Sequence, residues 1–78
     1  MKTIANEYEK YITKQTKIND TSQTIYTFEN DYQVSVLEVC NTSLFNLMII
    51  KHEIKDILLN LTPEQLIEKL EEVKNYEL

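Results

Sequence analysis

The 78-residue chain lacks glycine and arginine altogether, and it has one cysteine, one histidine and one proline. Without glycine it cannot form the loops that bring backbone amides against phosphates in P-loops and dinucleotide-binding folds. We therefore expect no nucleotide cofactor. Arginine is the residue most used for bidentate contacts to phosphate and guanine, so its absence, together with a net charge of −5, argues against direct binding to nucleic acid.

The single thiol and the single imidazole restrict the available chemistry. Cys40 alone excludes an intrachain disulfide and a cysteine-rich zinc site, and its neighbour Glu38 would not activate a thiolate. His52 stands between Lys51 and Glu53, with no second soft ligand and no glycine to help build an oxyanion site. We expect His52 to be a turn or surface residue, and we expect no metal, no cofactor and no enzymatic activity.

The length and the hydropathy pattern predict one small domain, residues 1–78. No apolar run approaches the roughly 18 residues of a membrane-spanning helix. The segment after Met1 is polar and charged, where a signal peptide would be apolar. These features predict a cytoplasmic location.

Helical patterns occur near both ends of the chain. The first has Thr3 as a candidate N-cap and apolar residues spaced for one helix face, at Ile4, Tyr8, Tyr11, Ile12 and Ile18. The second begins with Thr62 as N-cap, Pro63 at the first helical position and Gln65 completing a capping box. Its predicted buried stripe is Leu66, Ile67, Leu70 and Val73. We expect a helix at each of these places.

Residues 24–39 are rich in β-branched and aromatic side chains on both sides of a polar turn, which predicts a β-hairpin. A two-residue turn at Asn30 and Asp31 would leave both faces half polar. We therefore favour the register that places Phe28 opposite Val34, and Tyr26 opposite Val36, through a longer loop.

Residues 44–61 admit two interpretations. As a helix, they place one clean apolar arc along Leu47, Ile50, Ile54, Ile57, Leu58 and Leu61. As a strand followed by a turn, they pair back onto the hairpin, with Leu47 opposite Val36 and Ile49 opposite Val34. Three strands under helices form a stable layer, whereas an isolated hairpin is marginal. We favour a two-layer α+β fold with an N-terminal helix, a three-stranded antiparallel meander and a C-terminal helix, the alternative being a β-hairpin plus three helices.

A family resemblance covers about residues 32–74. It is carried by three stretches: Tyr32-x-Val34-Ser35-Val36, then SLFNLMIIK, then IKDILLNLTPEQLIEKLEEV. This succession resembles small accessory proteins of bacterial phages and prophages, in which a strand meander is followed by a helix with a Leu-Thr-x-Glu start. Those proteins usually have a glycine in the turn after the third strand, where this chain has Lys51-His52-Glu53. The resemblance implies an accessory protein of a phage or mobile element.

Acidic residues form the first candidate binding surface. Glu64, Glu68 and Glu72 repeat every four residues on the predicted C-terminal helix, and residues 20–50 contain four acidic residues and no basic one. A solvated face explains this pattern; so does a surface that binds a basic groove on a host protein. With the resemblance, the second interpretation predicts a non-catalytic inhibitor of a CRISPR-associated or other nuclease, similar in character to anti-CRISPR proteins. Its candidate partner-binding residues are Glu29, Asp31, Glu38, Glu64, Glu68, Glu71 and Glu72.

An apolar face is the second candidate surface. If the helices cover one side of the sheet, the other side is exposed, and exposed apolar patches usually bind a partner. This interpretation predicts a structural or regulatory homodimer, unless one helix covers each face. The residues concerned are Leu37, Val39, Leu44, Met48 and Ile50.

Overall fold

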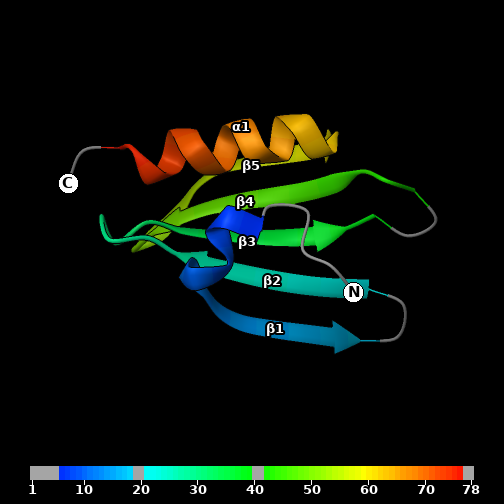
Figure 1. The fold of residues 1–78 in the computed structure, drawn as a ribbon, viewed down its shortest axis with the longest axis horizontal. Coiled ribbons are helices and arrows are strands. Elements are labelled where there is room, and N and C mark those ends of the chain that lie inside the picture. The colour runs from blue at the N-terminus through cyan, green and yellow to red at the C-terminus, as the bar shows by residue number, and fades with distance from the viewer. Residues whose placement is uncertain (1–5, 19–20, 40–41, 77–78) are drawn as a thin grey trace.

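The computed structural model describes residues 6–18, 21–39 and 42–76, which form a five-stranded antiparallel sheet and one α-helix (Figure 1). The strands follow one another across the sheet in chain order. In order, the elements are the 3-10 helix η1 (Asn6–Tyr11), β1 (Ile12–Ile18), β2 (Thr21–Thr27), β3 (Gln33–Glu38), β4 (Phe45–Lys51), β5 (Glu53–Leu61) and α1 (Pro63–Lys74). We call the side of the sheet that faces α1 and η1 the covered face, and the other side the open face.

The predicted N-terminal α-helix is wrong, because residues 12–18 form β1. Ile12, Thr13 and Thr16 are β-branched, so they lose side-chain freedom in a helix and suit a strand. Pairing with β2 also gives this segment a cross-strand contact, in which the Thr13 and Thr27 hydroxyl oxygens are 2.9 Å apart.

Three of the five apolar residues of that segment, Tyr8, Tyr11 and Ile12, pack in or against the core, although their secondary structure differs from the prediction. Tyr8 lies in η1 and is buried, and the Tyr11 ring lies 4.9 Å from that of Phe28. Thr3 and Ile4 lie outside the described residues. Helical spacing therefore identified residues that pack together, but a short 3-10 helix followed by a strand achieves the same packing.

The strand interpretation of residues 45–51 is confirmed, with Leu47 opposite Val36 and Ile49 opposite Val34. However, the chain then reverses at His52 and adds β5 as a fifth strand. The three-stranded meander and the alternative of a hairpin with three helices are therefore both wrong. Because the chain turns at His52, the apolar residues before and after it lie in two paired strands. In a helix the same residues would share one apolar arc.

The predicted β2–β3 hairpin exists, but its register differs by two residues. Tyr26 pairs with Val34, and Thr24 pairs with Val36. Phe28 belongs to the loop, because its amide donates to the Tyr32 carbonyl at 2.9 Å, and pairing begins one residue earlier. Since a shift of two residues preserves the alternation, the predicted core side chains still share one face.

The core lies between the covered face and the helices. α1 begins as predicted: Gln65 N donates to the Thr62 hydroxyl at 3.2 Å, and Thr62 N donates to Gln65 Oε1 at 2.9 Å. Leu70 and Val73 of α1 are fully buried. From η1, the sheet and the β2–β3 loop, the other buried apolar residues are Tyr8, Tyr26, Phe28, Val34, Val36, Phe45, Leu47 and Ile49, and α1 adds Leu66.

His52 adopts a left-handed conformation with φ of 67°. A residue with a Cβ atom loses about 1 to 2 kcal/mol there, and glycine does not. We expect His52→Gly to raise the free energy of unfolding by up to about 1 kcal/mol in urea denaturation, after the greater entropy of the unfolded glycine chain is subtracted.

The neighbouring residue supplies the control. Glu53 is exposed in β5 and is not among the described residues with positive φ. Glu53→Gly should therefore lower stability by roughly 0.5 to 1 kcal/mol. Equal losses in both variants would contradict a conformational cost at His52.

Candidate functional site

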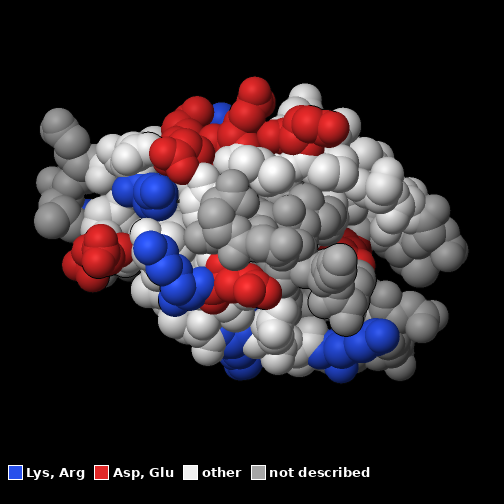
Figure 2. All heavy atoms as spheres, viewed as in Figure 1, with Lys and Arg blue, Asp and Glu red and all other residues white. Residues whose placement is uncertain are grey.

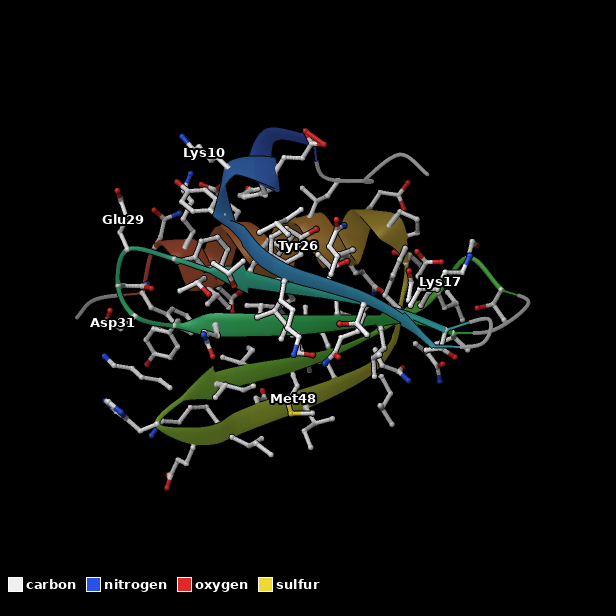
Figure 3. All side chains as sticks on the ribbon, turned by 90° about the horizontal axis from the view of Figure 1, so that it is seen from below. Lys10, Lys17, Tyr26, Glu29, Asp31 and Met48 are labelled. Carbon is white, nitrogen blue, oxygen red and sulfur yellow. The ribbon has the colours of Figure 1, made fainter. Side chains whose placement is uncertain are left out.

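The open face changes from polar to apolar across the sheet. Cross-strand partners share a face, and Met48 lies opposite both Ser35 and Ile57. The adjacent residue Leu47 is in the core, so Met48 must point to the open face. Figure 3 shows Met48 on the side of β4 away from α1. The apolar half of the open face therefore lies over β4 and β5.

Three large apolar residues of β5 are more than half exposed: Ile54 (55%), Ile57 (54%) and Leu59 (63%). Ile54 lies opposite Ile50, and Ile57 lies opposite Met48. We call this group the β4–β5 patch, comprising Leu37, Met48, Ile50, Ile54, Ile57 and Leu59. A shallow hollow of about 150 Å³ lies within it, lined by Ser35, Leu37, Asn46, Leu47, Met48, Ile57 and Leu59.

Several polar side chains on the other half of the open face bond to one another within the sheet. Gln23 Nε2 donates to the Ser35 hydroxyl at 2.8 Å, and Gln33 Nε2 donates to the Thr27 hydroxyl at 3.3 Å. These internal bonds leave the side of β1 and β2 polar and locally paired. The patch is thus bounded by polar groups, as binding surfaces commonly are.

The apolar residues predicted from sequence fall in two places. Leu37, Met48 and Ile50 belong to the β4–β5 patch. Val39 and Leu44 lie at the β3–β4 turn, where Val39 N donates to the Leu44 carbonyl at 3.0 Å. Sequence reasoning missed the three most exposed members. Ile54 and Ile57 fitted the apolar arc of a helix, and Leu59 was assigned to neither surface.

β5 is one of the two edge strands, and charged residues lie along its first half. Lys55 Nζ lies 3.5 Å from Glu53 Oε2, and Asp56 Oδ1 accepts a hydrogen bond from Ile57 N at 2.9 Å. The pairing of β5 with β4 is irregular between Ile49 and Ile50. This irregularity places Ile54 and Ile57, three residues apart, on the same face.

Glu71 and Glu72 have structural partners. The Tyr8 hydroxyl donates to Glu71, and Asn75 Nδ2 donates to Glu71 Oε2 at 2.9 Å. Lys69 Nζ lies 3.1 Å from Glu72 Oε1. These contacts lower the pKa of both carboxyl groups, chiefly through the Tyr8 hydrogen bond for Glu71 and the Lys69 hydrogen bond for Glu72. Glu71 therefore holds η1 against α1.

This contact predicts a pH-dependent stability. A carboxyl whose pKa is lower in the folded state stabilises the fold above its ordinary value of 4.5, and the contribution is lost as pH falls through the lowered pKa. We expect Glu71→Gln to unfold more readily than wild type at pH 7. The difference should narrow as the pH falls below about 4.5, which thermal melts across this range would measure.

Glu68→Gln is the matched control, because Glu68 is exposed on the same helix and makes no ion pair within the described residues. Its stability should differ little from wild type at either pH. A similar loss in both variants would show that general charge on α1, and not the Tyr8 contact, controls stability.

Glu64 and Glu68 are the exposed acidic residues of α1 that form no ion pair among the described residues. Acidic side chains gather along α1 at the upper border of Figure 2. Lys69 and Lys74 lie on the same helix and pair with Glu72 and Glu71. The freely available negative charge is therefore concentrated toward the first half of α1.

The remaining predicted acidic residues lie elsewhere. Glu29 and Asp31 are in the β2–β3 loop, and Figure 3 shows them at one end of the sheet. Glu38 ends β3, which runs away from that loop. The structure therefore distributes the seven predicted acidic residues over α1 and two ends of the sheet and does not unite them in one surface.

A second, polar recess of about 410 Å³ lies near the β2–β3 loop, lined by Lys10, Tyr11, Thr27, Phe28 and Glu29. Lys10 Nζ lies 5.3 Å from the centre of the Tyr11 ring. Both charged residues are exposed to solvent. Ligand sites for small molecules are usually enclosed and mostly apolar, and this recess is neither.

The described residues contain no cluster of three or more histidine, cysteine, aspartate or glutamate side chains suited to a metal ion. His52 is exposed on the β4–β5 turn, as predicted. Cys40 lies outside the described residues. Within the described part of the chain, no helix has the length and apolar character needed to cross a membrane.

Comparison with known proteins gives no family model, no curated protein and no solved structure that matches this chain. The surfaces described above are therefore interpreted from their own geometry and chemistry.

Proposed function

We propose that the protein is a non-catalytic binding protein that engages another polypeptide through the β4–β5 patch. One observation carries this proposal: Ile54, Ile57 and Leu59 are each more than half exposed on a single strand. Small folded domains rarely leave such residues together in water unless a partner covers them.

The physical basis is the removal of apolar surface from water. Burying a fully exposed large aliphatic side chain contributes about 1.5 to 3 kcal/mol. Each of the three is still more than half exposed, so roughly half of that contribution per residue remains available to binding, before ordering costs are subtracted. The sheet holds them in place before binding, which reduces the entropy lost on association. The neighbouring polar half of the open face would form the rim of the interface.

A non-catalytic role is supported by the chain's composition and by the position of His52. The chain has a single histidine and a single cysteine, and the imidazole lies exposed on a turn. A general base needs an orienting group and a nucleophile within reach. Glu53 follows His52 in sequence, but no serine, threonine or cysteine stands next to His52.

The test uses one disruptive variant and one matched control on the open face. Leu59→Lys introduces a charge into the patch, whereas Thr16→Lys introduces the same charge on β1. We expect Leu59→Lys to abolish chemical cross-linking to the partner and Thr16→Lys to preserve it. Equal cross-linking in both variants would contradict the proposal, provided that circular dichroism shows both to be folded.

A second candidate function uses the acidic side of α1. We propose it because Glu64 and Glu68 are exposed without an ion pair among the described residues, so their charge is available to a basic surface. Together with the phage-like sequence pattern, this supports an inhibitor of a host nuclease, anti-CRISPR-like in character. Such an inhibitor would act in the bacterial cytoplasm, where that nuclease works.

This candidate has its own test, inhibition of a purified CRISPR-associated nuclease. Replacing both Glu64 and Glu68 by glutamine should weaken inhibition, and raising the salt concentration should weaken it further. Glu29→Gln, which removes one acidic group at the far loop, is the control. Inhibition that is unaffected by salt and by the double replacement would contradict an acidic binding surface.

A further inference from the structure

We propose that the partner of the β4–β5 patch is a second copy of this chain, joined through antiparallel pairing of the two β5 strands about a two-fold axis. The inference rests on the proposed function, because it names the occupant of the same patch. Three features of β5 carry it: its position, its side-chain order and its charge order.

The position of β5 leaves one side of the strand free to pair with a second chain. The strand lies at the edge of the sheet, after β4 in the strand order, and most of its residues are exposed. In Figure 3, β5 runs along the lower border of the ribbon, on the side of the sheet away from β1. Edge strands present unpaired backbone groups that can bond to another strand.

The side-chain order is self-complementary. With the two-fold axis between Lys55 and Asp56, Ile54 of one copy lies opposite Ile57 of the other, and the reverse pair is equivalent. Both residues point to the open face, because the irregular pairing with β4 places them there. Pairing would therefore join two β4–β5 patches into one continuous apolar surface.

The charge order favours this register over the two neighbouring ones. An axis between Lys55 and Asp56 places Lys55 opposite the second copy's Asp56, and does so twice. An axis through Lys55 would oppose two lysines, and one through Asp56 would oppose two aspartates, which is unfavourable for directly opposite residues. Charged residues usually protect an edge strand against pairing, but adjacent charges of opposite sign favour a two-fold partner.

Asp56 would change its contact on association. In the single chain its carboxylate accepts from Ile57 N at 2.9 Å. In the pair it would turn to Lys55 of the second copy, leaving the Ile57 amide for a backbone carbonyl. Lys55 would likewise exchange its exposed contact with Glu53, which lies 3.5 Å away, for the new partner.

The test is a charge exchange across the axis, followed by sedimentation equilibrium. Lys55→Glu should weaken the dimer at least about tenfold, because two Glu–Asp oppositions replace two attractive pairs. Asp56→Lys should weaken it similarly, through two Lys–Lys oppositions. An equimolar mixture of the two variants should restore association to within about threefold of wild type, because each heterodimer again contains two pairs of opposite charge. Lys14→Glu on β1, the other edge strand, is the matched control and should leave association unchanged.

The outcomes separate this inference from the proposed function. Restored association in the mixture would also show that both variants fold. The β5 register would be overturned if neither single replacement weakened the dimer, or if the mixture of the two variants stayed monomeric. The wild-type chain could instead stay monomeric and cross-link to another protein, with this cross-linking lost in Leu59→Lys. That result would overturn the β5 dimer and keep the proposed function. If the wild-type chain is monomeric and its cross-linking to another protein is unchanged by Leu59→Lys, both the β5 dimer and the binding role of the β4–β5 patch would be overturned.

Discussion

Leu70→Ala is expected to lower the free energy of unfolding by about 3 to 4 kcal/mol. Leu70 is completely buried on α1, within the cluster that includes Leu47 of β4 and Val34 of β3. Alanine would leave a cavity that the surrounding side chains can fill in part, so the lost transfer energy and the cavity cost add together. The helix would then hold the covered face less firmly.

The expected effect is large for a domain of this size. A chain of 78 residues buries a smaller share of its surface than a larger domain, and its stability margin is correspondingly small. At about 4 to 8 °C for each kcal/mol, the loss should lower the melting temperature by roughly 12 to 30 °C in calorimetry.

Leu59→Ala is the matched control, since it removes the same atoms from a side chain that is 63% exposed. Measured at low protein concentration, it should change stability by no more than about 0.5 kcal/mol. Equal losses at Leu70 and Leu59 would mean that α1 does not form the main core with the sheet.

Asn30→Ala is expected to cost about 2 to 3 kcal/mol, the second largest effect. Asn30 lies in the β2–β3 loop with only 6% of its surface exposed. Its Nδ2 group donates to the Val73 carbonyl at 2.8 Å and to the Tyr76 carbonyl at 3.0 Å, and its Oδ1 accepts from Tyr32 N at 3.1 Å. One side chain thus joins the loop to the end of α1, and alanine would remove these bonds together with a longer one, at 3.4 Å, to the Lys74 carbonyl.

An isosteric variant shows whether donation is the essential property. Asn30→Asp keeps the shape, but an ionised carboxylate cannot donate to the Val73 and Tyr76 carbonyls. It should therefore destabilise the fold at pH 7 and recover part of the loss in acid, relative to wild type, because the protonated carboxyl can donate again. Chemical denaturation at both pH values measures this.

Asn46→Ala provides the comparison for Asn30. Asn46 Oδ1 accepts a single bond from the exposed Asn60 amide at 3.0 Å. We expect its removal to cost less than about 1 kcal/mol. A loss as large as that of Asn30→Ala would contradict the importance of the buried connection between the loop and α1.

The last helix could be predicted because its determinants are close together in sequence. Thr62, Pro63 and Gln65 define its start, and the buried positions Leu66, Leu70 and Val73 follow the helical period. The pairing of β3 with β4 could also be predicted, since alternation places Val34 and Val36 on one face. Both features could be predicted because they depend on residues close together in sequence or joined by one short turn.

β1 and β5 could not be assigned in this way. In β5, the irregular pairing with β4 places Ile54 and Ile57 on one face although they are three residues apart, which is also the spacing of a helix face. The same residues therefore fit two periods. In β1, Ile12 and Ile18 fit a helical stripe with Tyr8 and Tyr11, and the competing strand is stabilised by β2, a separate segment.

Some residues of the candidate site could likewise be predicted from the sequence, and others could not. Alternation alone places Leu37, Met48 and Ile50 on one face, but the more exposed Ile54, Ile57 and Leu59 depend on the presence of β5. The acidic row on α1 is visible from its spacing, whereas the bond from Tyr8 to Glu71 joins residues 63 positions apart. The contact makes Glu71 part of the structure and leaves Glu64 and Glu68 as the available charges of that row.

Composition excludes glycine-dependent phosphate loops and intrachain disulfides, and local capping and alternation define α1 and the core sides of β3 and β4. These properties follow from residue types and from neighbours along the chain. Tertiary structure decides which strands are edges, which face α1 leaves open, and which acidic groups are already bonded. The reason is that strand pairing joins distant segments, so a period in one segment cannot identify its partner or show which side remains uncovered.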